Sequence, residues 1–322
     1  MYACAAPDDP LIDAFARLYL APLGLAWDGF QVPALNDGWY PTSVSTNIAL
    51  AARICDDPAL TEFIARTDRE YPKRRMIPAT LLYEVVEDDV LLYGDSRLAV
   101  LKKPFHVILK SGPIAESHAH RDHLAIVMAP FSDDIGTPGY ASPLLFDWYR
   151  NSPSHNCVTV DGEQAKKVLA SHVERAPGGI RAVIGAGEWP CMAEATRTLT
   201  AEGDAMRDVT MLRGSAEHVY DWIFHSAGEA EYSCGGGDVP VLWEKPGFNL
   251  FANVRRMDAD GAFTARFTLE SGKALTLTVE DTTDLEIYTA RTPGNPADRM
   301  RSAVILRRRR RDAEFAVKFE QK

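Results

Sequence analysis

The sequence predicts a mostly β protein, a large antiparallel sandwich of two sheets preceded by a short all-α segment. Apolar residues recur at helical spacing up to about residue 69, and a basic, proline-containing stretch at 69–77 then interrupts this pattern. From Leu81 onward, about fifteen short strand-like runs are separated by turn residues. Such spacing without intervening helical patterns is typical of two packed antiparallel sheets. We therefore expect a helical segment over 1–77 and a β-sandwich domain over 78–322.

Three helices are expected in the first segment. The first begins with Asp9 as cap and Pro10 as first helical residue. The others are expected over 44–55 and 58–67, and the turn residues of NDGWYP predict a loop around 36–41. The apolar faces of three short helices need a partner, which the sheets, another chain or further helices would provide.

The strand-like runs are short and bounded by Gly, Pro, Asn and Asp. One charged block interrupts them, the RRRRR run at 307–311, for which we favour a solvated hairpin tip over part of an anionic groove. In chain order the runs are LLYEVV, VLLYGD, LAVLKK, FHVILK, LAIVM, NCVTV, IRAVIGA, MAEATRTL, RDVTMLRG, HVYDWIFHS, FTARFTL, LTLTV, LEIYTA, SAVILRR and FAVKF.

Composition narrows the class of function. The chain has 35 Lys and Arg against 45 Asp and Glu, a net charge of −10, so it is a poor general binder of nucleic acid or membrane surfaces. A polyanionic substrate would need a local basic patch. The five cysteines are scattered and form no C-x-x-C pair, which argues against a disulfide framework.

No secretory signal pattern opens the sequence, and no apolar run is long enough to span a membrane. We therefore expect a cytoplasmic protein, or a periplasmic or secreted one if the natural N-terminus is missing.

The stretch 117–164 holds four of the eight histidines and is the candidate site. In a strand, His118 and His120 of the H-A-H motif would point to the same face and could bind one metal ion. Asp134 and His155 could supply further ligands from neighbouring strand ends. His–Asp–His donors suit zinc, with manganese as the alternative. The competing ligand candidates are Asp122, His123 and Asp133.

Other polar residues of this stretch suit proton transfer or substrate binding. Tyr140 follows a turn rich in Gly and Pro, and a phenol is available as an acid at neutral pH, although a packed loop aromatic is equally compatible. Arg150, Tyr149 and Asn156 flank His155 and could bind a carboxylate or a sugar hydroxyl. We expect less of the remaining histidines, of which His172 is predicted in a loop and His225 is the best candidate.

Four blocks in order, SHAHRDHL, DDIGTPGY, YRNSPSHNCVTVDGEQ and VYDWIFHSAG, resemble the sheet domain of the heparinase II/III-like polysaccharide lyases. The likeness extends over about 81–319 and is greatest to the exolytic oligoalginate lyases. NDGWYP resembles the last part of the (α/α) toroid of that family.

This resemblance implies a role for each of several residues. His118 would be an active-site residue with Tyr140 beside the cleft, and His120, Asp134 and His155 would hold a metal ion that braces the active-site loops. The implied reaction is β-elimination at a uronate, with alginate oligosaccharides as the favoured substrate and a 4,5-unsaturated sugar as product. The two proton transfers suit His and Tyr.

One departure from the family pattern affects the expected activity. In the family a large toroid supplies further catalytic residues, and the N-terminal segment here is too short to form one. We therefore expect either part of a longer lyase or a shortened relative with impaired catalysis, with a non-catalytic carbohydrate-binding or structural sandwich as the alternative. The expected partners are an acidic oligosaccharide and either a second copy of the chain or a missing N-terminal toroid.

Overall fold

A computed structural model describes residues 24–26, 31–39, 42–43, 61–62, 65, 69, 88–94, 96–112, 118–164, 171–186 and 191–321. The chain divides into two compact units, one of Met1–Ala34 with Tyr40–Asp89 and one of Leu35–Trp39 with Val90–Lys322. The helices expected near residue 10 and over 44–55, the run LLYEVV and the predicted boundary at 77/78 lie outside the described residues. Of the helix expected over 58–67, the described positions 61, 62 and 65 are helical.

The first unit contains one described pair of strands, β1 (Gln31–Val32) and β2 (Thr42–Ser43), which are antiparallel. Between them, Leu35–Trp39 belongs to the second unit. No helix among the described residues is both long and apolar enough to cross a membrane.

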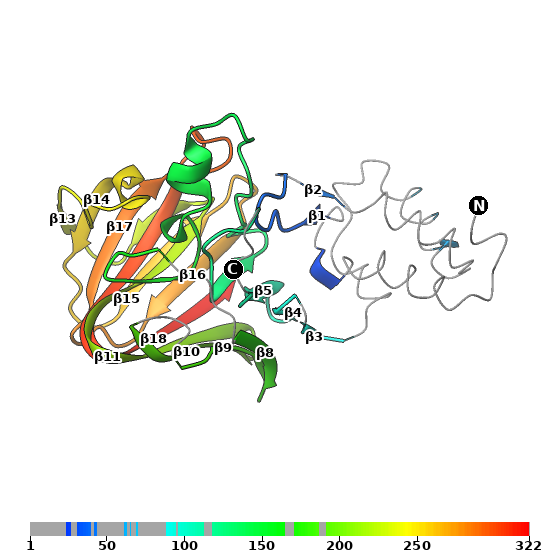
Figure 1. Cartoon of the computed structure of the whole chain (residues 1–322), viewed down its shortest axis with the longest axis horizontal. Coiled ribbons are helices and arrows are strands. Elements are labelled where there is room, and N and C mark those ends of the chain that lie inside the picture. Colours follow the sequence, from blue (N-terminus) through cyan, green and yellow to red (C-terminus); the bar gives the residue numbers. More distant parts are fainter. Residues whose placement is uncertain are drawn as a thin grey trace. The chain divides into compact units, whose positions relative to one another are not determined.

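The second unit contains two antiparallel sheets, which confirms the predicted fold class (Figure 1). The small sheet has the order β3-β4-β5-β6, and the large sheet has twelve strands with the path β12-β15-β16-β18-β11-β10-β9-β8. The strands of the small sheet are β3 (Val90–Tyr93), β4 (Leu98–Leu101), β5 (Val107–Lys110) and β6 (Ala125–Met128). Those of the large sheet are β7 (Val158–Val160), β8 (Ser171–Ala176), β9 (Gly179–Ile184), β10 (Met192–Glu202), β11 (Ala205–Ser226), β12 (Glu229–Tyr232), β13 (Gly236–Asp238), β14 (Ala252–Met257), β15 (Phe263–Thr268), β16 (Ala274–Val279), β17 (Glu286–Thr292) and β18 (Arg301–Gln321).

Two long strands form the middle of the large sheet and replace four predicted ones. RDVTMLRG and HVYDWIFHS are both parts of β11, and SAVILRR and FAVKF are both parts of β18. The RRRRR run therefore lies inside β18, and its prediction as a hairpin tip was wrong. A register shift between Arg213 and His218 interrupts the pairing of the two strands, which resumes beyond it. The polar residues at this place therefore form an irregularity within two continuous strands and not the strand ends that were predicted.

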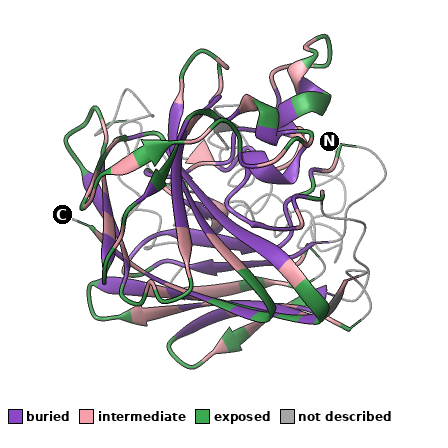
Figure 2. Cartoon of the chain, turned by 90° about the vertical axis from the view of Figure 1, so that its left-hand side faces the viewer, coloured by how far each residue is buried: buried purple, intermediate pink, exposed green. Residues whose placement is uncertain are grey.

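Alternation along β11 and β18 gives the large sheet an apolar core on each face. Tyr220, Trp222 and Phe224 pack in the core between the two sheets, whereas Ile223 packs in a second cluster with Trp148. Figure 2 shows buried residues running along the strands of the sheets. Because burying one large apolar side chain stabilises the fold by about 1.5–3 kcal/mol, the inter-sheet core is the main source of stability.

A buried ion pair ties the loops of the candidate site to the large sheet. Arg197 of β10 pairs with Asp208 of β11, and both side chains are fully buried. The remaining guanidinium nitrogen, Nη1, donates to the carbonyl oxygens of Leu124 at 2.7 Å and Asn156 at 2.6 Å. Leu124 precedes β6 and Asn156 precedes β7, so one side chain fixes two chain segments that are far apart in sequence.

We expect Arg197→Leu to lower the free energy of unfolding by about 3–5 kcal/mol, because Asp208 would be left buried and unpaired. The double variant Arg197→Leu/Asp208→Leu should recover part of this loss. Chemical denaturation of both variants, with Arg207→Leu as a matched control, tests the prediction. Arg207 pairs with Glu202 at the surface, where the loss should stay below about 1 kcal/mol. An equal effect of the two single substitutions would contradict the assigned role.

Candidate functional site

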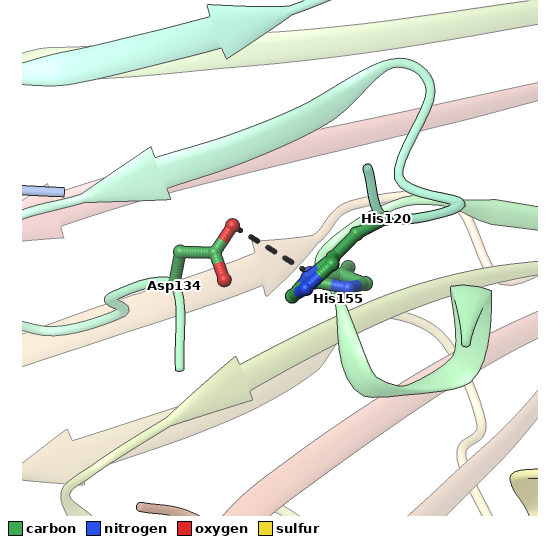
Figure 3. A group of neighbouring side chains, drawn as sticks. All are labelled: His120, Asp134 and His155. Carbon is green, nitrogen blue, oxygen red and sulfur yellow. Dashed lines mark ion pairs between the residues drawn. The ribbon is translucent and has the colours of Figure 1, made fainter. Parts of the chain in front are cut away.

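Three buried side chains from separate segments converge beside β6 (Figure 3). His120 comes from the loop before β6, Asp134 from the turn after it, and His155 from the end of the 3-10 helix Ser152–Ser154. Their potential ligand atoms all lie within 4.8 Å of one another, and His155 Nδ1 is 3.7 Å from Asp134 Oδ2. Two imidazoles and one carboxylate are a donor set that zinc sites use. We call these residues the buried trio.

Hydrogen bonds set the tautomer of both imidazoles in the buried trio. His155 Nε2 lies 3.0 Å from the Tyr149 carbonyl oxygen and must donate to it, so Nδ1 keeps its lone pair. His120 Nε2 lies 3.2 Å from Asp37 Oδ1, while its Nδ1 is buried without a hydrogen-bond partner in the described structure. Burial lowers the pKa of each imidazole to about 4. Both rings are therefore neutral at pH 7, which is the form that binds metal ions.

The surroundings of Asp122, His123 and Asp133, the competing ligand candidates, suit a metal ion less well. Asp122 Oδ2 accepts a hydrogen bond from Lys110 Nζ at 2.6 Å, and this cation holds the pKa of Asp122 below its usual value despite burial. His123 is buried but lies outside the buried trio. Burial and then the charge of Asp134 raise the pKa of Asp133 well above its ordinary value. Among the described residues, His120, Asp134 and His155 thus form the best-matched donor set.

Asp37 is the residue that sequence reasoning missed. The turn residues of NDGWYP predicted only a loop here, yet the Asp37 side chain is 4% exposed and its carboxylate lies between two histidines. Oδ2 is 3.0 Å from His118 Nδ1, Oδ1 is 3.2 Å from His120 Nε2, and Arg150 donates to both oxygens. Burial would raise the pKa of Asp37, but these donors outweigh it and lower the pKa to about 2. Only the resemblance of NDGWYP to a family block pointed to this position.

His118 and Tyr140 form an exposed pair beside the buried trio. Their side chains are 65% and 57% exposed, and His118 Nδ1 lies 2.9 Å from the Tyr140 hydroxyl. Because Nδ1 donates its proton to Asp37, the Nε2 lone pair of His118 is available as a base. Partial desolvation and then the Asp37 charge raise the pKa of Tyr140, so its phenol stays protonated at neutral pH. The pair therefore offers a base and an acid together.

The expectation that His118 and His120 point to one face of a strand was wrong. His118 has φ = 62°, in the left-handed region, and no described strand contains the H-A-H motif. This turn exposes the ring of His118 and buries the ring of His120. The single motif thus divides into a buried ligand candidate and an exposed proton-transfer candidate.

Burial also corrects two of the three predicted substrate-binding residues. The Tyr149 hydroxyl is buried and donates to the Gly294 carbonyl oxygen at 2.7 Å. The Asn156 amide is buried and bonds to Ile126, Ser132 and His225. Neither side chain offers a polar atom to a substrate, so both are structural. Arg150 is partly exposed, but Asp37 already engages its guanidinium group.

The remaining histidines lie outside the site. His225 is buried and bonds to Thr292 and to the Pro153 carbonyl oxygen, so it supports the loop that carries His155. The prediction that His172 lies in a loop was wrong, because His172 belongs to β8. The sequence SHVERA is polar for a strand, but its backbone pairs with β9 along one edge. His218 lies 2.7 Å from Asp161.

The antiparallel sandwich, with the buried trio at its loops, can be compared with known families. Residues 92–316 match the family model described as Heparinase II/III-like, C-terminal, so the chain belongs to this family. No curated protein matches the sequence.

Several solved structures share the fold, and two of them show its extent. A mutant of the heparan sulfate lyase HepC from Pedobacter heparinus has a TM-score of 0.65 and 13% identity, over 94% of this chain and 45% of that one. Heparinase III has a TM-score of 0.62 and 12% identity, over 96% and 48% respectively. The chain spans less than half the length of either structure. The likeness to oligoalginate lyases stays a prediction.

Acid should destabilise the folded chain in a defined window. Between pH 6.5 and about 4, the unfolded chain binds protons at His120, His123 and His155 that the folded chain does not bind. The contribution of these rings to the free energy of unfolding should therefore be fully present above pH 6.5 and fall by up to ~1.4 kcal/mol per pH unit for each imidazole. Asp133 and Asp134 act in the opposite direction, because burial raises the pKa of both carboxyls in the folded chain. Urea unfolding across this range, with a chelator present, measures the slope.

The matched variant for this window is His123→Phe, which removes one titrating ring outside the buried trio. Its slope should be shallower than that of the wild type. Asp37 affects the free energy of unfolding at lower pH. Because its pKa is lowered to about 2 in the folded chain, its contribution to stability is lost only as the pH falls from 3.8 toward 2. A slope of His123→Phe equal to that of the wild type would contradict the neutral state of the His123 ring, because the other titrating groups are the same in both proteins.

Proposed function

We propose that this chain contributes to the β-elimination of uronate-containing glycans, as the sheet-domain side of a polysaccharide lyase active site. The observation that supports this most strongly is the exposed His118–Tyr140 pair, which one buried carboxylate orients. Membership of the heparinase II/III-like family supports the same reaction class.

The reaction needs a base and an acid on one substrate. His118 Nε2 takes the C5 proton of the uronate, and the electrons of that C–H bond form the C4–C5 double bond. The C4–O4 bond breaks, and the Tyr140 hydroxyl gives its proton to O4. Transfers by positioned side chains of this kind are each worth roughly 10²–10⁴ in rate. Asp37 stabilises the imidazolium that forms, because its carboxylate bonds to Nδ1 of the same ring.

We further propose that the buried trio holds one divalent metal ion, with zinc favoured over manganese. The unpartnered Nδ1 of His120 and the two neutral imidazoles fit such an ion. The ion would supply a fixed positive charge that braces the loops before and after β6. Asp37 extends this bracing to the exposed pair, because it bonds both to His120 and to His118.

The substrate class within the uronates has two candidates. The sequence motifs favour alginate oligosaccharides, whereas one structural neighbour is a heparan sulfate lyase. We therefore propose an acidic oligosaccharide as the substrate and test both kinds.

Incubation with heparan sulfate or alginate oligosaccharides should give the ultraviolet absorbance of a conjugated uronate. His118→Ala and Tyr140→Phe should lower the rate by about 100-fold or more, since each removes one proton transfer. His172→Ala, at an exposed histidine of β8, is the matched control and should keep the wild-type rate.

A flat trace with every uronate polymer would rule out lyase activity of this chain. If glycan binding then persisted in the His118→Ala/Tyr140→Ala double variant, the protein would be a non-catalytic carbohydrate-binding sandwich instead.

Elemental analysis of protein purified without chelator should find about one divalent ion per chain, and His120→Ala should abolish it. The variant should also melt at a lower temperature, because an ion present at 100 times its Kd stabilises the native state by about 2.7 kcal/mol. His172→Ala should keep both the metal and the melting temperature. Wild-type protein without any divalent ion would disprove the assignment of the buried trio.

A further inference from the structure

Exposed aromatic side chains gather around His118. The described part of the chain has six exposed large hydrophobic side chains, of which three are aromatic: Trp39 at 65%, Tyr140 at 57% and Phe146 at 64%. Large aromatic rings exposed to water are costly, and a group of them marks an interaction site.

Direct contacts connect these three rings into one surface. The Trp39 ring packs beside Gly139, and the Trp39 backbone bridges to Thr137, so Trp39 lies next to the turn that carries Tyr140. Tyr140 contacts His118, whose partner Asp37 binds Arg150. The Arg150 guanidinium lies 5.1 Å from the centre of the Phe146 ring. A continuous chain of contacts thus connects Trp39 and Phe146 to the His118–Tyr140 pair.

Rigid elements hold the surface in place. Phe146 belongs to a short π-helix, Leu145–Tyr149, whose Trp148 and Tyr149 side chains donate to the carbonyl oxygens of Pro293 and Gly294. Asp37 anchors the loop of Trp39 through its backbone bond to His118 and its ion pair with Arg150. Rings held this way bind a ligand with little loss of conformational entropy.

The surface also carries positive charge at its edge. Arg121 is exposed, and its backbone N–H donates to the Arg150 carbonyl oxygen at 3.0 Å. No acidic partner of the Arg121 side chain is found among the described residues. Aromatic faces beside a guanidinium match a pyranose ring, which has an apolar C–H face, joined to a sugar that carries a carboxylate.

We propose that Trp39 and Phe146 are sugar-stacking residues next to the proton-transfer pair, and that Arg121 binds a carboxylate of an adjacent uronate. The proposal rests on the proposed lyase function and extends it. The glycan would be held by sugar rings flanking the cleaved bond, and a neutral oligosaccharide would lack the Arg121 contact.

Calorimetric titration with a heparan sulfate tetrasaccharide and an alginate tetrasaccharide tests the proposal. Trp39→Ala and Phe146→Ala should each weaken binding of the better ligand by about three- to tenfold, and Trp39→Phe should restore most of the affinity. Where turnover is measurable, KM should rise and kcat should stay near the wild-type value, because stacking acts equally on substrate and transition state. Arg121→Gln should weaken binding most at low salt.

The control is Met211→Ala, at an exposed apolar side chain of β11, which should bind as the wild type does. Binding without product formation would support the stacking surface while disproving the lyase function. Wild-type affinity in both alanine variants, or no binding of either tetrasaccharide by the wild type, would overturn the proposal. So would self-association of the wild type that Trp39→Ala abolishes while glycan affinity is unchanged.

Discussion

The buried pair of Arg197 and Asp208 is the interaction on which the geometry of the site depends. A fully buried guanidinium is costly unless every donor finds an acceptor. Here Asp208 accepts hydrogen bonds from the guanidinium group of Arg197, and the carbonyl oxygens of Leu124 and Asn156 accept the bonds of Nη1. These two carbonyls belong to the segments that carry His120 and His155. The hydrogen bonds of Arg197 therefore hold the segments of His120 and His155 at a fixed distance from each other.

Asp37 fixes the positions of the exposed His118 and the buried His120 relative to each other. Its carboxylate joins His118 to His120, and the ion pair with Arg150 holds it in place. One carboxylate contacts both rings, but they differ in burial and in neighbours, since His118 also contacts Tyr140 and His120 lies beside His155. Burial keeps the ring of His120 neutral and available to a metal ion, while exposure leaves Nε2 of His118 accessible to a substrate. A loop remote in sequence thus couples the two halves of the site.

The sequence predicted those features that depend on local periodicity. Alternation of apolar residues predicted most of the strands and the antiparallel class, and the histidines of 117–164 predicted the residues that converge. It failed where a tertiary contact overrides the local pattern. The sequence places Arg307 in an exposed block of charges, but in the structure Arg307 lies within β18 and pairs with the buried carboxylate of Asp221. His118 reads as a strand residue until its positive φ turns the ring to the surface. Asp37 could not be found because its partners lie more than 80 residues away.

Charge balance around the buried trio gives a reason for a cation at this place. Lys110 offsets Asp122, and Arg150 offsets Asp37, so each of these carboxylates has its own partner. Asp134 accepts the Gly136 N–H and has no Lys or Arg ion pair among the described residues, and burial raises its pKa. Without an ion in the site, an ionised Asp134 would therefore be an uncompensated carboxylate, which would repel a uronate. A divalent ion held by the trio would reverse that sign, so the same ion that braces the loops would make the field favourable to an acidic glycan in a chain whose net charge is −10.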